Sequence, residues 1–253
     1  MSKPYCIVSP DYDYTSGGIK VMWGLYGHLL AKGVEVYMNR RPAKHTIAIY
    51  PEITQGNPAN GETVVRYILN KPGVMSSNGV SGPTEFETTD NLYYFSRLFG
   101  DTNGNHYMFL PVIDLHTFYD QRKKRDKRAV FVGKGQDLGL HKPGAIIINR
   151  ELAQDQQELA NLLNECEVLY CYDPVTAMTE VARLCGCRVV IYPSTYTLSE
   201  FGKYEPGLNG ISWGTDQGIK LETGLFRFDY MNLKKEFDLK LDLFIEDTQH
   251  ENN

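Results

Sequence analysis

The segment from Glu165 to Pro193 constrains the fold more than any other part of the sequence. It reads ECEVLYCYDPVTAMTEVARLCGCRVVIYP: an apolar run, a turn with proline, a run with helical spacing, a glycine and a second apolar run. This order predicts a buried strand, a helix over 176–184 capped near Gly186, and another buried strand over 188–192. A strand, a helix and a strand in that order form a βαβ unit, so we expect parallel strands in a sheet covered by helices.

The same alternation continues on both sides of this segment. Val64–Leu69 is predicted to begin a helix that stops before Pro72, 74–90 is predicted to be a surface loop, and 230–246 predicts a long closing helix from its near-helical spacing of apolar residues. The other predicted helices are 19–32 and 153–164. The other predicted strands are 5–9, 34–38, 46–50, 92–99, 107–110, 129–132, 145–149 and 168–172.

The chain has 253 residues, enough for two compact domains. The basic run Arg122–Arg128 is the best boundary, which gives an N-terminal domain over 1–125 and a C-terminal domain over 126–253 that includes the closing helix. The predicted fold class is therefore α/β, with two Rossmann-like, doubly wound parallel sheets. In such domains ligands bind at the carboxyl ends of the strands, so we expect a cleft where these ends face each other.

Composition narrows the classes of partner. The net charge is −5, whereas proteins that bind duplex nucleic acid usually carry a basic face, so nucleic acid is not the expected partner. The basic run is interpreted as a solvated linker, with a basic rim for anionic substrates or a peripheral membrane contact as the alternative. The five cysteines form no metal-binding spacing and predict reduced thiols in a cytoplasmic protein. No metal site is predicted, and the oligomeric state is left open.

Two glycine-containing loops follow predicted strands. Gly17 and Gly18 open the first helix, and Gly133 and Gly135 flank Lys134 after the strand over 129–132. Glycine lets backbone N–H groups approach a phosphate or a sugar, and a lysine there places a compact positive charge on a diphosphate. The alternative is that both segments are ordinary turns.

A third group surrounds the helix over 176–184. Asp173 ends the preceding strand, the Thr176 hydroxyl and the N–H groups near Ala177 suit a phosphate, and Glu180 suits ribose hydroxyls. The alternative makes Asp173 an N-cap and Glu180 a solvated helix residue.

Glu52 follows the strand over 46–50, within the sequence YPEITQGNP. If the strand register places it at the cleft, its carboxylate could bind an acceptor hydroxyl or act as a general base. A structural carboxylate in a turn is the alternative.

The order of these segments along the chain resembles that of GT-B-type glycosyltransferases of the glycosyltransferase group 1 family, and of a short bacterial and phage subgroup of it. SGGIKVMWGLYGHLLAKGVEVYM is similar to the opening βαβ unit, and IYPEITQGNPANGETVVRYILNKPG is similar to a signature of the subgroup. VFVGKG resembles the first strand of the second domain, and DPVTAMTEVARLCGCRVVIYP resembles the helix that binds the nucleotide sugar.

The resemblance implies roles for single residues. Glu180 matches the glutamate that binds the donor ribose, Lys134 matches a contact to the diphosphate, and Gly17-Gly18 match the loop near donor phosphate and acceptor. Glu180 corresponds to the second of two glutamates in the family, and the first, which contacts the donor sugar, stands eight positions earlier. Here Tyr172 stands at that position and Asp173 one place later.

The implied activity is metal-independent transfer of a sugar from a nucleotide donor to a glycan, lipid-linked or small-molecule acceptor, with retention of anomeric configuration and no cofactor. Lys134 and Glu52 are the expected catalytic residues. Two alternatives stay open. One is a catalytically degenerate nucleotide-binding protein of the same fold. The other is a nucleotide-sugar epimerase or hydrolase, for which Glu52, Asp114 and His116 are the candidate groups.

Overall fold

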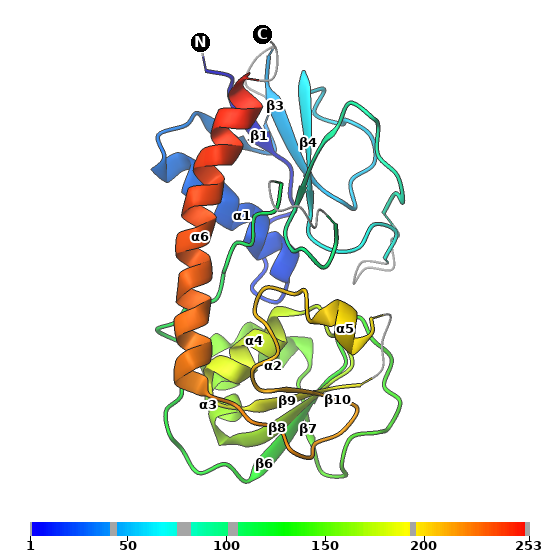
Figure 1. Ribbon diagram of the computed structural model, residues 1–253, viewed down its shortest axis with the longest axis vertical. Coiled ribbons are helices and arrows are strands. Elements are labelled where there is room, and N and C mark those ends of the chain that lie inside the picture. Colours follow the sequence, from blue (N-terminus) through cyan, green and yellow to red (C-terminus); the bar gives the residue numbers. More distant parts are fainter. Residues whose placement is uncertain (1, 41–44, 75–81, 101–105, 193–195, 251–253) are drawn as a thin grey trace. The chain divides into compact units, whose positions relative to one another are not determined.

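The computed structural model describes residues 2–40, 45–74, 82–100, 106–192 and 196–250 (Figure 1). The chain divides into two compact units. Unit 1 comprises Met1–Val112 and Leu233–Asn253, and unit 2 comprises Ile113–Asn232. The last helix, α6 (Thr223–His250), begins in unit 2 and ends in unit 1. It confirms the closing helix predicted over 230–246 and starts earlier.

Unit 1 contains a five-stranded parallel sheet with the strand order β2-β1-β3-β4-β5. The strands are β1 (Tyr5–Ile7), β2 (Val36–Met38), β3 (Ile47–Pro51), β4 (Thr63–Ile68) and β5 (Asn91–Tyr94). Every residue of β3 and β4 is buried, as expected for central strands of a parallel sheet. The helix α1 (Gly17–Ala31) lies close to the helix predicted over 19–32, and the Ser16 side chain caps its first turn.

The helix predicted to begin at Val64 is wrong, because this segment is strand β4. Its sequence, TVVRYI, is dominated by β-branched and aromatic side chains, which favour strands. A short apolar run has no periodicity that separates a buried strand from a helix. Two other strands predicted in unit 1 are longer than those observed. The strand predicted over 92–99 ends at Tyr94, and of 107–110 only Tyr107 forms a bridge, to Tyr94. The loop predicted over 74–90 forms no helix or strand at 74 and 82–90, and its residues 75–81 lie outside the described chain.

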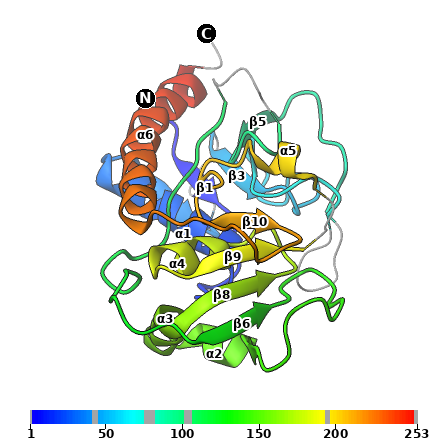
Figure 2. The ribbon, with the colours of Figure 1, turned by 60° about the horizontal axis from the view of Figure 1, so that its bottom comes forward.

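Unit 2 contains a second five-stranded parallel sheet, with the order β10-β9-β8-β6-β7. Figure 2 shows β6, β8 and β9 side by side and pointing the same way. Its strands are β6 (Lys127–Phe131), β7 (Ile146–Ile147), β8 (Cys166–Cys171), β9 (Arg188–Ile191) and β10 (Ile211–Trp213). Its helices, besides the start of α6, are α2 (Arg150–Gln154), α3 (Gln156–Glu165), α4 (Ala177–Leu184) and α5 (Leu198–Phe201). The helix predicted over 153–164 is thus two helices, because Asp155 is extended and caps α3.

Both sheets place their second strand on one side of the first strand and the remaining three on the other. The connection therefore changes direction between β1 and β3 in unit 1 and between β6 and β8 in unit 2. In open α/β sheets, ligands bind beyond the carboxyl ends of the strands at such a switch point. The predicted α/β class with two Rossmann-like parallel sheets is confirmed, and each sheet has one such switch point.

The basic run is a solvated linker only in part, because Arg122, Lys123 and Lys124 are exposed but its later residues make structural contacts. The Arg125 guanidinium donates to the carbonyl oxygens of Asn164 (2.8 Å) and Cys185 (2.7 Å) and pairs with Asp120. Lys127 and Arg128 lie in β6 and form ion pairs with Glu165 and Glu167 at 2.5 Å each. These contacts tie the start of β6 to β8 and to the end of α3, so part of the run is structural.

Candidate functional site

The loops after β6 and β8 meet at the switch point of unit 2. The backbone N–H of Lys134, after β6, donates to Oδ2 of Asp173, after β8, at 3.1 Å. The N–H of Gly135 donates to the carbonyl of Val132 at 2.9 Å, which closes a tight turn around the lysine. The Lys134 residue is exposed to solvent. The structure therefore brings together two of the groups predicted from sequence, and it fixes the backbone of the lysine while leaving its ammonium group accessible.

This close approach requires both glycines. Gly133 has a positive φ of 58°. A Cβ there would lie 2.6 Å from Asp173 Oδ2. A Cβ on Gly135 would overlap the carbonyl oxygen of Tyr172. Any side chain at either position would push the loop away from β8. The glycines therefore allow the two loops to touch, and they also allow the tight turn.

Asp173 is only 7% exposed. Burial raises the pKa of its carboxyl group, and the Lys134 charge and the N–H groups of Lys134 and Val175 oppose this shift. The pKa is raised on balance, so burial disfavours the charged carboxylate more than these neighbours favour it.

The N-terminus of α4 follows directly. Thr176 caps the helix by accepting from the N–H of Met178 at 3.4 Å, and Ala177 begins the first turn. Both residues are partly exposed. The first N–H groups of a helix carry partial positive charge and suit an anion. Thr176 is thus the N-cap of the helix predicted over 176–184, and Ala177 is its first residue.

Glu180, predicted to bind ribose, is buried, and its Oε1 accepts from the Tyr204 hydroxyl at 2.8 Å. Three residues later, Arg183 is fully buried, and burial lowers its pKa to about 10 while Glu180 opposes the shift. Arg183 donates to the carbonyls of Gly207 (2.8 Å) and Asn209 (3.1 Å), and it faces the Phe226 ring at 4.1 Å. Contact between Glu180 and a ribose stays a prediction and would have to share the carboxylate with Tyr204.

Tyr172, which stands at the position of the family's other glutamate, is also buried. Its hydroxyl accepts from the N–H of Leu140 at 2.9 Å, and its ring stacks on that of Tyr192 with centroids 5.1 Å apart. Tyr172 therefore holds the loop after β6 through the hydrogen bond of its hydroxyl to Leu140. The signal that could have revealed this role is the alternation Val168, Tyr170, Tyr172, which places three side chains on one face of the sheet.

In unit 1, Gly17 and Gly18 form the first turn of α1, and a Cβ on Gly18 would touch the Leu69 side chain at 3.5 Å. Glu52, which follows β3, is 7% exposed, and its Oε2 accepts from the N–H of Leu69 at 2.9 Å. Both predicted groups thus neighbour Leu69, at the carboxyl end of β4. The role of Glu52 toward an acceptor stays a prediction, since one of its oxygens already has this structural partner.

Sequence reasoning missed a buried arginine of unit 1, Arg66 on β4. Its guanidinium pairs with Asp90 at 2.7 Å and donates to the carbonyls of Thr54 (2.8 Å) and Gly56 (2.6 Å). It therefore fastens the β3–β4 loop to the sheet. A single arginine inside the apolar strand TVVRYI was the available signal, because a buried charge requires a partner.

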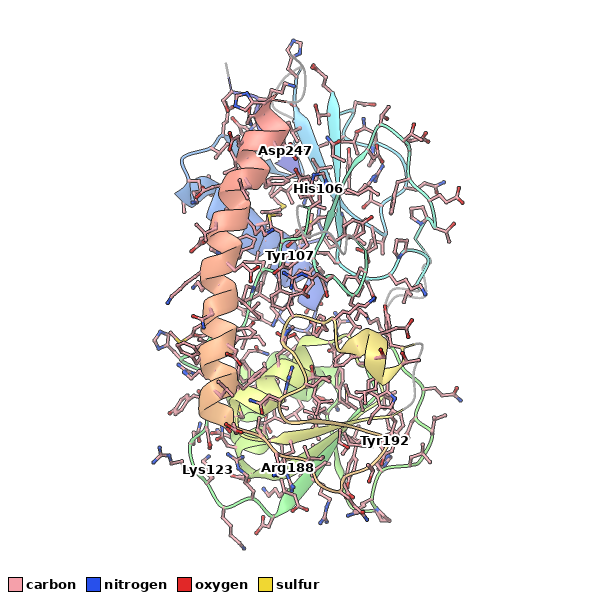
Figure 3. The ribbon with its side chains drawn as sticks, in the orientation of Figure 1. His106, Tyr107, Lys123, Arg188, Tyr192 and Asp247 are labelled. Carbon is pink, nitrogen blue, oxygen red and sulfur yellow. The ribbon has the colours of Figure 1, made fainter. Side chains whose placement is uncertain are left out.

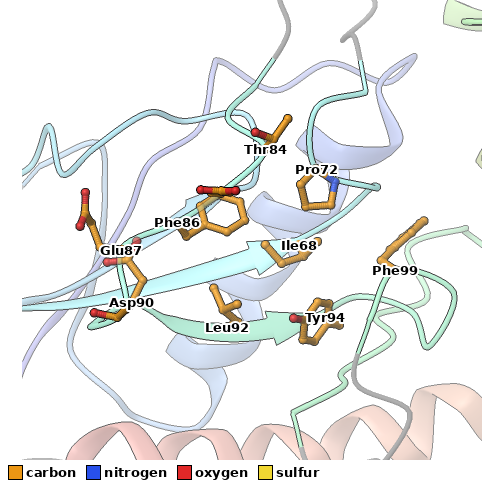
Figure 4. A pocket seen from close by; sticks show the side chains of 11 residues that line it. Ile68, Pro72, Thr84, Phe86, Glu87, Asp90, Leu92, Tyr94 and Phe99 are labelled. Atoms are coloured by element: carbon orange, nitrogen blue, oxygen red, sulfur yellow. The ribbon is translucent and has the colours of Figure 1, made fainter.

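Unit 1 also has a cavity of about 470 Å³, which includes none of the predicted site residues (Figure 4). Ile68 and Leu92 form its floor on β4 and β5, with Phe86 and Pro72 across from them (Figure 4). The Phe86 ring lies 5.5 Å from the Arg66 guanidinium, so the same arginine supports one wall. The cavity adjoins β4 and β5, away from the β1–β3 switch point.

Asp173 gives a testable pH dependence. Its folded pKa is raised, so ionising it costs stability as pH rises from its unfolded pKa through its folded pKa. Asp173→Asn removes this cost and keeps an oxygen for the Lys134 N–H. We expect the variant to be more stable than the wild type at neutral pH and equal to it near pH 3, by urea unfolding at both values. A variant less stable at neutral pH would show that the carboxylate charge is favourable where it lies.

In the described part of the chain, no helix is both long and apolar enough to cross a membrane. Nor do His, Cys, Asp and Glu side chains gather there in groups of three or more that could hold a metal ion.

Comparison with known proteins adds little. No family model matches the sequence, and no curated protein matches it. Among solved structures, an uncharacterized protein from Klebsiella pneumoniae matches with a TM-score of 0.42 and 14% identity over 79% of this chain and 86% of that one. The C-terminal part of E. coli RcsC, with a linker region and a phosphoreceiver domain, matches with a TM-score of 0.24 and 11% identity over 96% of each chain. Both TM-scores are below 0.5, so neither similarity supports an argument about this protein.

Proposed function

We propose that the protein is a glycosyltransferase that moves a sugar from a nucleotide diphosphate donor to a glycan, lipid-linked or small-molecule acceptor, without a metal ion and with retention. The observation that carries this proposal is the junction of Lys134 and Asp173 at the switch point of unit 2, followed by the N-terminus of α4. The resemblance to GT-B glycosyltransferases in the same segments supports it.

The chemistry follows from charge. When a glycosidic bond to a nucleoside diphosphate breaks, negative charge grows on the leaving phosphate. An ammonium group and oriented helix N–H groups stabilise that charge most effectively when they are fixed in advance. The Lys134 backbone is fixed by Asp173, and Thr176 and Ala177 supply the helix terminus. In this proposal, Lys134 holds the leaving diphosphate, and Glu52 acts on the acceptor.

A binding protein that has lost transfer activity is the second candidate, and a specific observation favours it. The family's two glutamates correspond to Glu180, whose carboxylate bonds Tyr204, and to Tyr172, which is buried. Neither presents a free carboxylate to a sugar. For an epimerase or hydrolase, the candidate acid Asp114 already accepts hydrogen bonds from the N–H of His116 and the hydroxyl of Thr117 in its own turn.

A thermal-shift screen tests donor binding. The probes are UDP, GDP, ADP, CMP and dTDP and their common sugar esters. A ligand at 100 times its dissociation constant stabilises the fold by about 2.7 kcal/mol. We expect one nucleoside diphosphate to raise the melting temperature of the wild type selectively, and less so for Glu180→Ala. No shift with any probe would exclude the donor site. A shift without measurable sugar transfer would favour the binding protein.

A further inference from the structure

The loop that carries Lys134 is held more by tyrosine hydroxyls than by apolar burial. Residues 132–145 join β6 to β7. The Leu138 and Leu140 side chains are 48% and 52% exposed. Three glycines of the loop have positive φ: Gly133, Gly139 and Gly144. Such a backbone has much conformational entropy to lose, so hydrogen bonds to the sheet are needed to fix it.

Two tyrosines bond both backbone polar groups of Leu140. Its N–H donates to the Tyr172 hydroxyl at 2.9 Å, and its carbonyl accepts from the Tyr192 hydroxyl at 2.6 Å. Tyr172 follows β8, and Tyr192, labelled in Figure 3, follows β9. The two rings stack with an interplanar angle of 23°, so each supports the orientation of the other. We call this arrangement the tyrosine clamp.

Neighbouring contacts extend the tyrosine clamp toward the end of the loop. His141 Nδ1 lies 3.2 Å from the Tyr172 hydroxyl. Lys142 pairs with Asp216, which also accepts from the Tyr170 hydroxyl at 3.3 Å. At the start of the loop, the only side-chain bond to its backbone among the described residues comes from Asp173, at the N–H of Lys134. The six-residue step from Lys134 to Leu140 is thus fixed at both ends.

We propose that Tyr192 is a positioning residue, whose hydroxyl holds Leu140 and thereby keeps Lys134 in place to bind a nucleoside diphosphate. The diphosphate part rests on the proposed function. A lysine on a loose loop loses conformational entropy when the ligand binds, which weakens binding. The tyrosine clamp restricts the loop before binding, so less entropy is lost when the ligand binds. Tyr192 does not touch the ligand and acts through Lys134.

Amide hydrogen exchange tests the clamp without any ligand. The variants are Tyr192→Phe and Tyr172→Phe, which keep the rings and remove one hydroxyl each. The matched control is Tyr119→Phe, an exposed tyrosine of unit 2. We expect exchange at Leu140 and at 133–135 to be about three- to tenfold faster in both clamp variants and unchanged in the control. Unchanged exchange at Leu140 would overturn the clamp, and faster exchange at Leu140 alone would overturn the positioning of Lys134.

A double-mutant cycle tests whether the effect passes through Lys134. The dissociation constants of UDP and GDP are measured for the wild type, Tyr192→Phe, Lys134→Ala and the double variant. We expect Tyr192→Phe to weaken binding about three- to tenfold in the wild type and not at all beside Lys134→Ala. Equal weakening in both backgrounds would overturn the proposal. If the wild type binds neither nucleotide, the diphosphate role fails, and the exchange result shows separately whether the clamp holds the loop.

Discussion

Replacing Lys134 by alanine is expected to lower kcat/KM for sugar transfer by about 100- to 1000-fold, the loss seen when one preorganised group that stabilises developing charge is removed. The lysine is the one basic residue in the turn that bonds Asp173, and it is exposed to solvent. The fold should survive, because the anchoring bond uses the backbone N–H, which alanine retains. Steady-state kinetics with the donor found by thermal shift measures the effect.

Lys203→Ala is the matched control, since Lys203 is an exposed lysine of unit 2 on a different loop. It should leave kcat/KM unchanged. If Lys134→Ala raises the donor KM and keeps kcat, the lysine binds the donor equally before and during transfer and does not stabilise the leaving group. If neither parameter changes, the assignment of the diphosphate to this turn is wrong.

Replacing Arg66 by alanine is expected to destabilise unit 1 by about 3–5 kcal/mol, the cost of leaving one partner of a buried ion pair alone. The Arg66 and Asp90 side chains are 3% and 4% exposed. The substitution also leaves the carbonyls of Thr54 and Gly56 without their donor and opens a gap under the Phe86 ring. Urea unfolding followed by fluorescence measures the loss.

The two tryptophans allow unit 1 to be followed separately. Trp23 belongs to unit 1 and Trp213 to unit 2, so a Trp213→Phe background leaves the signal of unit 1. Arg66→Met combined with Asp90→Leu should recover much of the stability, because it removes the stranded carboxylate together with its partner. A double variant as unstable as Arg66→Ala would show that the bonds to the β3–β4 loop matter more than the ion pair.

The sequence allowed several of the buried strands to be predicted, because parallel strands buried on both faces leave apolar runs. It did not predict α5 or β10. The strands at 46–50, 168–172 and 188–192 were predicted within two residues of their observed ends. Prediction failed at 63–68, because a short apolar run has no periodicity that separates a buried strand from a helix. The β-branched and aromatic side chains of this segment favour the strand that β3 and β5 flank.

The candidate site was predicted only in part. Glycines and lysine in one loop and an aspartate in another were each visible, but the separation of 39 positions between Lys134 and Asp173 conceals their contact. Glu180 was judged by its place on a helix, whereas its burial depends on Tyr204, which approaches from a later loop. Arg66 and Arg183 were overlooked because the residues next to a buried arginine in the sequence do not indicate which distant groups it will bond. Pairing between distant segments is what the structure adds.

The cysteines of this protein can serve as reporters of transient local opening of its fold. All five are buried thiols that form no disulfide: Cys6 lies in unit 1, and Cys166, Cys171, Cys185 and Cys187 lie in unit 2. Burial raises the pKa of Cys166 and of Cys185 to about 12, so these thiols are inert while the fold is closed. Alkylation under native conditions therefore proceeds only through transient opening. Mass spectrometry of the labelled peptides would time the opening of each unit separately, without any introduced probe.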